Sequence, residues 1–273
     1  MLLCNPSPAV SSDEATDQDY ARQYNVDFVS RWDELIDWKK RAAGEGHFFT
    51  DLLLAAGACR VFDVSTGSGF HAAQLREACF DVTASDGSPT MVERARANFK
   101  QRDLRIPLYQ SDWSELVHLQ KKHKLGPFDA VLCLGSSLCH IFNREARIEV
   151  LRCFRSLLKP GGMLLIDQRN FQAILAGHFA SSGQYYYCGK TARVTIGKLH
   201  DSLCEFVYTF ADGARYRLRV CPIMPAQLRS ELMAAGFIVK QSFGDFKPVY
   251  DPMHTDFIIH QAFSPESPSK AIS

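Results

Sequence analysis

Short apolar segments alternate with helical patterns through the middle of the chain, and this alternation constrains the fold most strongly. The apolar segments lie at 59–65, 81–86, 106–113, 128–135 and 163–169, with helical patterns at 70–78, 91–99 and 144–158 between them. Segments that are apolar throughout are typical of parallel strands buried on both faces. Because parallel strands need right-handed crossovers, the pattern predicts an α/β fold with a doubly wound, mostly parallel sheet.

The residue composition of the sequence changes after Asn170. Segments between 183 and 221 are rich in aromatic and β-branched residues, and A-D-G at 211–213 is typical of a hairpin turn. We therefore expect an antiparallel β insertion within 171–224, after the fifth strand. K-P-G-G at 159–162 predicts a turn before that strand. A helix at 225–235 and strands at 237–243 and 256–263 would complete a seven-stranded sheet.

Composition and charge limit the classes of function. The chain is 46% hydrophobic and 22% charged, as in soluble globular proteins. A net charge of +1 gives no global field that favours nucleic acid or an anionic membrane. No apolar run approaches the roughly 18 to 20 residues that span a bilayer. We expect one domain over 19–263, with tails rich in Ser and Pro at 1–18 and 264–273.

Nine cysteines are an odd number without a C-x-x-C pair, which favours neither disulfides nor a zinc site. The N-terminus has no basic region ahead of a sustained apolar stretch, so it does not read as a secretory signal. We therefore expect a reduced, cytoplasmic protein without a metal centre. Monomer and homo-oligomer are both compatible with the sequence.

The first apolar segment ends in D-V-S-T-G-S-G, from Asp63 to Gly69. Two glycines let the backbone turn tightly and approach a ligand without a Cβ in the way. Ligands of doubly wound sheets bind beyond the carboxyl ends of the strands, where this segment would lie. Gly67, Gly69 and Ala72 also fit G-x-G-x-x-A, so the turn alone leaves a dinucleotide cofactor open.

Acidic residues at successive strand ends favour S-adenosylmethionine over a dinucleotide. Asp63 precedes the glycines, where its carboxylate can accept from backbone amides and from a ligand ammonium. Asp86 ends the second strand, the usual place to hold two ribose hydroxyls. Asp112 and Trp113 end the third, where a carboxylate and an indole can contact an adenine. Taken singly, each of these residues is more often a helix cap, a turn residue or a core residue. Their occurrence at the ends of successive strands is unlikely to be a coincidence.

Five motifs carry a more specific resemblance: D-x-x-T-G-x-G-F-H, L-C-L-G-S-S-x-x-H-x-F, P-G-G-x-L-x-I-D-Q-R-N, S-S-x-x-Y-Y-Y-C-G and G-D-F-K-P-x-Y. The first is common to many methyltransferases, and the other four are far more particular. From about Tyr20 to Phe263 the chain resembles the class I methyltransferases and, within them, the glycine and glycine/sarcosine N-methyltransferases of betaine synthesis.

The resemblance implies a Rossmann-like fold and S-adenosylmethionine as methyl donor, with S-adenosylhomocysteine as product. It implies that Trp32 and Arg41, in an N-terminal helix, close over the cofactor and that Arg41 pairs with the cofactor carboxylate. With Asp63, Gly67 and Gly69, it places the following residues around the cofactor: Tyr24, Ser65, Asp86, Met91, Asp112, Trp113, Leu134 and His140.

Arg169, directly after the fifth strand, is the candidate anchor for a methyl acceptor with a carboxylate. Arginine binds carboxylates bidentately, although by spacing alone this residue is as easily an ordinary surface arginine. The resemblance implies the anchor role. It also places Tyr187 and Tyr208 near the acceptor, where their hydroxyls can orient the amine and their faces can stabilise a developing cation.

Two departures from the family concern the acceptor. Ser136 stands where members usually carry asparagine in L-G-N-S, and serine keeps one donor but loses the reach of the amide. Val220 and Cys221 replace a second tyrosine of the animal enzyme, as in the betaine-pathway enzymes. The resemblance implies a small amino acid substrate, glycine and sarcosine. The near-neutral charge and the absence of a long apolar run predict no nucleic acid or membrane partner. Another small carboxylated amine, an NAD(P)-dependent oxidoreductase and a non-catalytic cofactor-binding protein are the alternatives.

Overall fold

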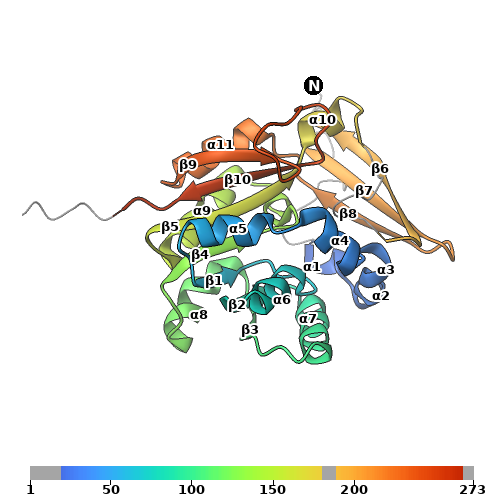
Figure 1. Cartoon of the computed structure of the whole chain (residues 1–273). Helices are drawn as coiled ribbons and strands as arrows, with labels where there is room; N and C mark the ends of the chain where they lie inside the picture. Colours follow the sequence, from blue (N-terminus) through green and yellow to red (C-terminus); the bar gives the residue numbers. More distant parts are fainter. Residues whose placement is uncertain (1–19, 180–188, 267–273) are drawn as a thin grey trace, which may run out of the picture.

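The computed structural model describes residues 20–179 and 189–266. In these residues seven strands form one sheet, in the order β3-β2-β1-β4-β5-β10-β9, and three form a second sheet, in the order β6-β7-β8 (Figure 1). The strands of the large sheet are β1 (Arg60–Asp63), β2 (Asp81–Asp86), β3 (Leu108–Gln110), β4 (Phe128–Cys133), β5 (Leu158–Arg169), β9 (Ile238–Gly244) and β10 (Phe257–Phe263).

The first five strands pair in parallel, whereas β10 is antiparallel to both β5 and β9. The small sheet is antiparallel and consists of β6 (Ala192–His200), β7 (Leu203–Phe210) and β8 (Arg215–Val220). The prediction of a mostly parallel seven-stranded sheet with an antiparallel insertion after the fifth strand is therefore confirmed.

Helices cover both faces of the large sheet. They are α5 (Phe48–Ala55), α6 (Phe70–Glu77), α7 (Pro89–Gln101), α8 (Leu116–His123), α9 (Arg144–Leu157) and α11 (Pro225–Ala234). Successive side chains of a strand point to opposite faces of the sheet, so each strand contributes side chains to the two hydrophobic cores on either side. Phe62 and Val131 pack in the core that includes Leu151 of α9. Val61 packs in the other core, which includes Ala72 of α6.

The N-terminal region was expected to contain one helix carrying Trp32 and Arg41, and this expectation is wrong. The region forms four short helices: α1 (Tyr20–Gln23), α2 (Val26–Ser30), α3 (Trp32–Leu35) and α4 (Trp38–Glu45). Two of the three breaks arise because Asn25 and Asp37 adopt extended backbone and cap the next helices, and the third is a turn at Arg31 without a side-chain cap. The Asn25 side chain accepts from the amide of Phe28 at 2.9 Å.

K-P-G-G lies within β5 rather than before it. Phe128 pairs with Leu158 and Ala130 pairs with Met163, so the four residues 159–162 bulge out of the ladder. The amide of Ser264 donates to the carbonyl of Gly162 at 2.8 Å, which ties the start of the expected C-terminal tail to this bulge. The tail expected at 1–18 and the residues after 266 lie outside the described residues.

Three short helical elements remain: α10 (Phe171–Leu175) and the 3-10 turns η1 (Trp113–Glu115) and η2 (Ser137–His140). The small sheet and helices α1–α4 gather at the same end of the large sheet (Figure 1). Throughout the described ranges, no helix is both long and apolar enough to cross a membrane.

Candidate active site

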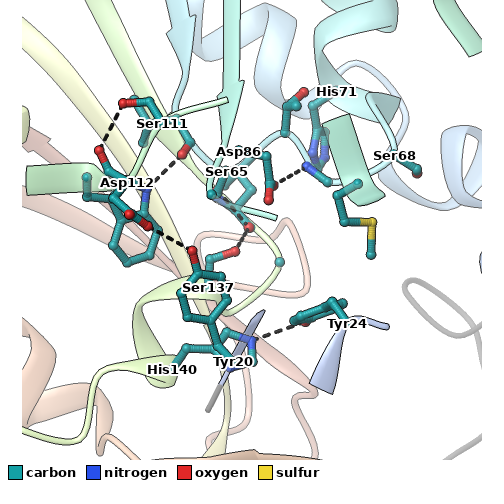
Figure 2. A pocket seen from close by; sticks show the side chains of 18 of the residues that line it. Tyr20, Tyr24, Ser65, Ser68, His71, Asp86, Ser111, Asp112, Ser137 and His140 are labelled. Carbon is teal, nitrogen blue, oxygen red and sulfur yellow. Dashed lines mark hydrogen bonds between the residues drawn. The ribbon is translucent and has the colours of Figure 1, made fainter. Parts of the chain in front are cut away.

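A cavity of about 360 Å³ opens beyond the carboxyl ends of β1–β4, within the size range of cofactor sites. Figure 2 shows polar side chains that surround it. The lining includes most of the cofactor residues expected from the sequence: Tyr24, Trp32, Arg41, Ser65, Gly67, Asp86, Met91, Asp112, Trp113, Leu134 and His140. Asp63 and Gly69, also expected there, lie behind the lining.

The glycine turn has two different uses. Both glycines have a positive φ, +53° at Gly67 and +91° at Gly69, where a side chain is disfavoured. Gly67 lines the cavity. At Gly69 an added Cβ would lie 2.5 Å from the ring of Phe99, so this glycine lets α6 begin close to α7.

Asp86 and Asp63 end β2 and β1, and the first is half-buried whereas the second is buried. Asp86 accepts from the backbone amides of Gly67 at 2.8 Å and Ser88 at 2.9 Å. Burial nevertheless raises the pKa of Asp86 to about 6, and it raises the pKa of Asp63 as well. Oδ2 of Asp63 has no hydrogen-bond partner within the described residues, so a donor from a ligand would stabilise it.

Asp112 and Trp113 follow β3 and contact a residue that the sequence did not suggest. The hydroxyl of Tyr20 donates to Asp112 at 2.9 Å. The indole N–H of Trp113 donates to the carbonyl of Val64 at 2.7 Å, which fixes the ring against the cavity. Burial raises the pKa of Tyr20, so this hydroxyl stays protonated as a donor.

A buried ionic cluster joins α4 to α6. Nε of Arg41 contacts Glu45 at 2.6 Å, and the other oxygen of Glu45 contacts Nε2 of His71 at 3.0 Å. Burial opposes ionisation of Glu45, but Arg41 and His71 together lower its pKa to about 2. Arg41 and His71 both line the large cavity.

A second cavity, of about 30 Å³, adjoins the first. Four residues line both: Tyr24, Trp32, Gly135 and His140. At this junction the Tyr24 hydroxyl lies 3.1 Å from Nε2 of His140 (Figure 2). Burial lowers the pKa of His140 to about 4, so its imidazole is neutral at pH 7.

Arg169 lies at the small cavity, as expected for an acceptor anchor, and it is buried. Its guanidinium packs over Phe257, 4.3 Å from the ring centroid. Ser136 and Tyr208 line the same cavity, and the remaining wall is apolar: Phe171, Phe206, Leu218, Val220 and Phe257. A buried guanidinium beside a small apolar cavity suits a ligand with a carboxylate and little else.

Ser136 connects the loop after β4 to the end of β5. Its amide donates to Asp167 at 2.7 Å, and its hydroxyl accepts from the amide of Arg169 at 2.6 Å. Its φ of +59° lies in the left-handed region, which asparagine tolerates better than most residues. The serine therefore positions the backbone of Arg169. Tyr187, the other expected acceptor residue, lies outside the described residues.

Sequence reasoning missed Tyr20, Glu45 and His71. His71 follows the glycine turn directly, and Glu45 stands one helical turn after Arg41, so both carried a local signal. Except for Val220, the apolar wall of the small cavity carried none, because its members are ordinary strand or helix residues from distant segments. Among the residues that the structure describes, no group of three or more His, Cys, Asp or Glu could hold a metal ion.

Comparisons with known proteins agree with this geometry. A family model described as "Methyltransferase domain" matches residues 61–162. The glycine/sarcosine N-methyltransferase of Halorhodospira halochloris is 40% identical over 246 residues, which cover 89% of each chain. The enzyme of the same name from Aphanothece halophytica is 40% identical over 251 residues, covering 91% of this chain and 93% of its own.

Among solved structures, an S-adenosylmethionine-dependent methyltransferase from Clostridium acetobutylicum shares the fold with a TM-score of 0.66. Its sequence identity is 16%, and the superposition covers 88% of this chain and 98% of that one. The curated relatives match nearly the whole described chain at far higher identity. The chain belongs to the glycine/sarcosine N-methyltransferase family.

Proposed function

We propose that this protein is an S-adenosylmethionine-dependent N-methyltransferase that converts glycine to sarcosine and sarcosine to N,N-dimethylglycine. The names of its relatives at 40% identity support this function. The observation that carries it is the buried guanidinium of Arg169 at a small cavity that shares four lining residues with the large one. We also propose that the dimethylglycine serves the synthesis of betaine, an osmolyte.

The large cavity fits S-adenosylmethionine. Asp86 would accept from the two ribose hydroxyls, and Asp112 and Trp113 would contact the adenine. Arg41 would pair with the amino acid carboxylate. Asp63 lies behind the lining, and its carboxylate would stabilise the ammonium electrostatically. When bound, this cofactor supplies a methyl group on a sulfonium, which leaves as a neutral thioether.

Arg169 would hold the acceptor carboxylate, and the size of the small cavity would limit the acceptor to a small amino acid. The amine would then point to the junction that Tyr24 and His140 share with the cofactor cavity. The apolar wall of the small cavity would keep water away from the amine. Among the described residues of the small cavity there is no carboxylate, so positioning of a neutral amine supplies most of the rate enhancement.

We propose a cytoplasmic location as well. All seven cysteines within the described residues are free, which suits a reducing compartment. The NAD(P)-dependent oxidoreductase considered from the sequence is not proposed, because the relatives cover about nine tenths of the chain and are methyltransferases.

The test is a product assay on the full chain with S-adenosylmethionine and a panel of amines: glycine, sarcosine, alanine, β-alanine and ethanolamine. Mass spectrometry should detect sarcosine and dimethylglycine from the first two substrates and little product from the rest. Methylation of alanine or β-alanine in preference to glycine would replace the proposed acceptor. The absence of any methylated product would overturn the enzymatic proposal.

A further inference from the structure

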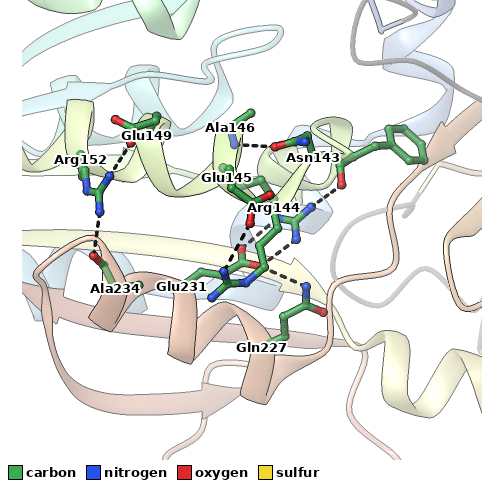
Figure 3. A network of polar contacts seen from close by, with 11 residues as sticks. Asn143, Arg144, Glu145, Ala146, Glu149, Arg152, Gln227, Glu231 and Ala234 are labelled. Atoms are coloured by element: carbon green, nitrogen blue, oxygen red, sulfur yellow. Dashed lines mark hydrogen bonds and ion pairs between the residues drawn. The ribbon is translucent and has the colours of Figure 1, made fainter.

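Two buried Arg–Glu pairs in the described residues have different surroundings. Arg147 of α9 contacts Glu231 of α11 at 2.9 and 2.7 Å and also donates to the carbonyls of Ile141 and Phe142, each at 2.9 Å. Gln227 donates to the same glutamate at 3.0 Å (Figure 3). Protein groups thus surround this pair between two helices, and its role is to hold α9 and α11 together.

The second pair, Arg41 and Glu45, lies instead at the wall of the large cavity. Glu45 uses one oxygen for Nε of Arg41 and the other for Nε2 of His71. Both of its partners line the cavity, while Glu45 lies behind them. The side chains of Glu45 and Arg41 are 5% and 7% exposed, so the contact is shielded from solvent and from screening by salt.

Two carboxylates and one arginine carry the formal charges of the described cavity lining. Asp112 and His71 lie on opposite sides of the cavity in Figure 2, with Asp86 between them. Among the described residues that line it, Arg41 is the one Lys or Arg side chain. A ligand carboxylate is therefore repelled by Asp86 and Asp112 and drawn to Arg41.

We propose that Glu45 is a positioning residue for the carboxylate of the bound cofactor, because its two oxygens hold Arg41 and His71 at the same end of the cavity. The inference rests on the proposed function, in which the amino acid part of S-adenosylmethionine lies at that end. A carboxylate on Nε fixes the plane of the guanidinium and reduces the side-chain entropy that is lost when a ligand binds. Without Glu45, both side chains would have to be ordered by the ligand itself.

The test compares two ligands in titration calorimetry: S-adenosylhomocysteine and 5′-methylthioadenosine, which lacks the amino acid. The wild-type protein should prefer the first. Glu45→Gln keeps the size of the side chain but removes its charge. It should weaken S-adenosylhomocysteine binding at least about tenfold and change methylthioadenosine binding less than about twofold. In kinetics, the KM for S-adenosylmethionine should rise while kcat at saturation stays near the wild-type value.

The matched control is Glu77→Gln. Glu77 also pairs with an arginine, Arg102 at 3.0 Å, but this pair is half-exposed at the surface, so neither affinity should change. If Glu45→Gln fails to fold, His71→Asn tests the same cluster and should weaken only S-adenosylhomocysteine, about threefold or more.

Two results would overturn the inference: an equal loss of affinity for both ligands, which marks a structural role, or an unchanged preference in Glu45→Gln. A wild-type protein that binds the two ligands equally tightly would instead reject the proposed placement of the cofactor, and the inference would fail with it.

Discussion

The two adjoining cavities are built in different ways. The larger is lined by the segments that follow β1–β4, so residues such as Gly67 and Asp86 meet there because parallel strands end at one edge. The smaller is closed by the inserted sheet, whose Tyr208 and Val220 face Arg169 at the end of β5. In the proposed function the parallel sheet would therefore provide the cofactor site, and the insertion would select the acceptor. Changes in one cavity should leave the function of the other nearly intact.

The largest expected effect is at Arg169. Removing one partner of a buried charge pair costs about 3–4 kcal/mol, so Arg169→Ala should lower kcat/KM for glycine about a hundred- to a thousandfold. Arg169→Lys keeps the charge but loses the bidentate geometry of the guanidinium, and it should lower kcat/KM for glycine at least about tenfold. Binding of S-adenosylhomocysteine should change less than about twofold in both variants. Arg215→Ala, an exposed arginine on β8, is the control and should match the wild type in both assays.

Asp86→Ala is the reciprocal change in the large cavity. It should weaken S-adenosylhomocysteine binding by one to two decades, because hydrogen bonds to a charged group contribute about 1.5–3 kcal/mol. The KM for glycine, measured at saturating cofactor, should stay near the wild-type value. An unchanged cofactor affinity would remove Asp86 from the cofactor site, and an equal loss in both measurements would show that the cavities are not separable.

The raised pKa of Asp86 predicts a pH dependence of cofactor binding. Ribose hydroxyls donate to the ionised carboxylate, so the ligand binds the deprotonated form better. With a pKa near 6 in the free protein, about a tenth of Asp86 is ionised at pH 5, and the Kd of S-adenosylhomocysteine should rise about tenfold from pH 7 to pH 5. Calorimetry at several pH values checks this. Asp86→Asn should flatten the profile, and a variant profile as steep as the wild type would assign the dependence to another group.

Ser136→Asn should have the smallest effect. Asparagine suits the left-handed backbone of this position and restores the residue that the family usually carries. We expect kcat/KM for glycine to rise about two- to tenfold, with cofactor affinity unchanged. Steady-state kinetics with glycine and sarcosine measure the change. A loss of activity on both substrates would mean that the serine hydroxyl, which accepts from the amide of Arg169, is the better support for the anchor.

The sequence predicted the large sheet well because its central strands are buried on both faces. The segments at 59–65, 81–86 and 128–135 contain β1, β2 and β4. It did not predict α5 or α8, and the expected single N-terminal helix is broken between Trp32 and Arg41, where Asp37 caps a new helix. Side-chain caps of this kind compete with helix continuation, and their outcome depends on tertiary packing.

Several residues that line the large cavity were predictable for the same reason, since Ser65, Asp112 and Leu134 each follow a strand. The sequence does not reveal which of several neighbouring residues faces the cavity, and Asp63 and Gly69 lie behind its lining. Most of the apolar wall of the small cavity could not be predicted. Leu218 and Phe257 come from separate segments of the chain, and nothing in their local sequence distinguishes them from other apolar strand residues.

The most direct test of the central claim, that the small cavity selects its acceptor through a carboxylate, compares glycine with glycinamide under one set of conditions. Glycinamide keeps the amine and the size of glycine but removes the charge that Arg169 would hold. With the wild-type protein and saturating S-adenosylmethionine, kcat/KM for glycinamide should be at least about a hundredfold lower than for glycine. Equal methylation of the two amines, unchanged by Arg169→Lys, would contradict the claim.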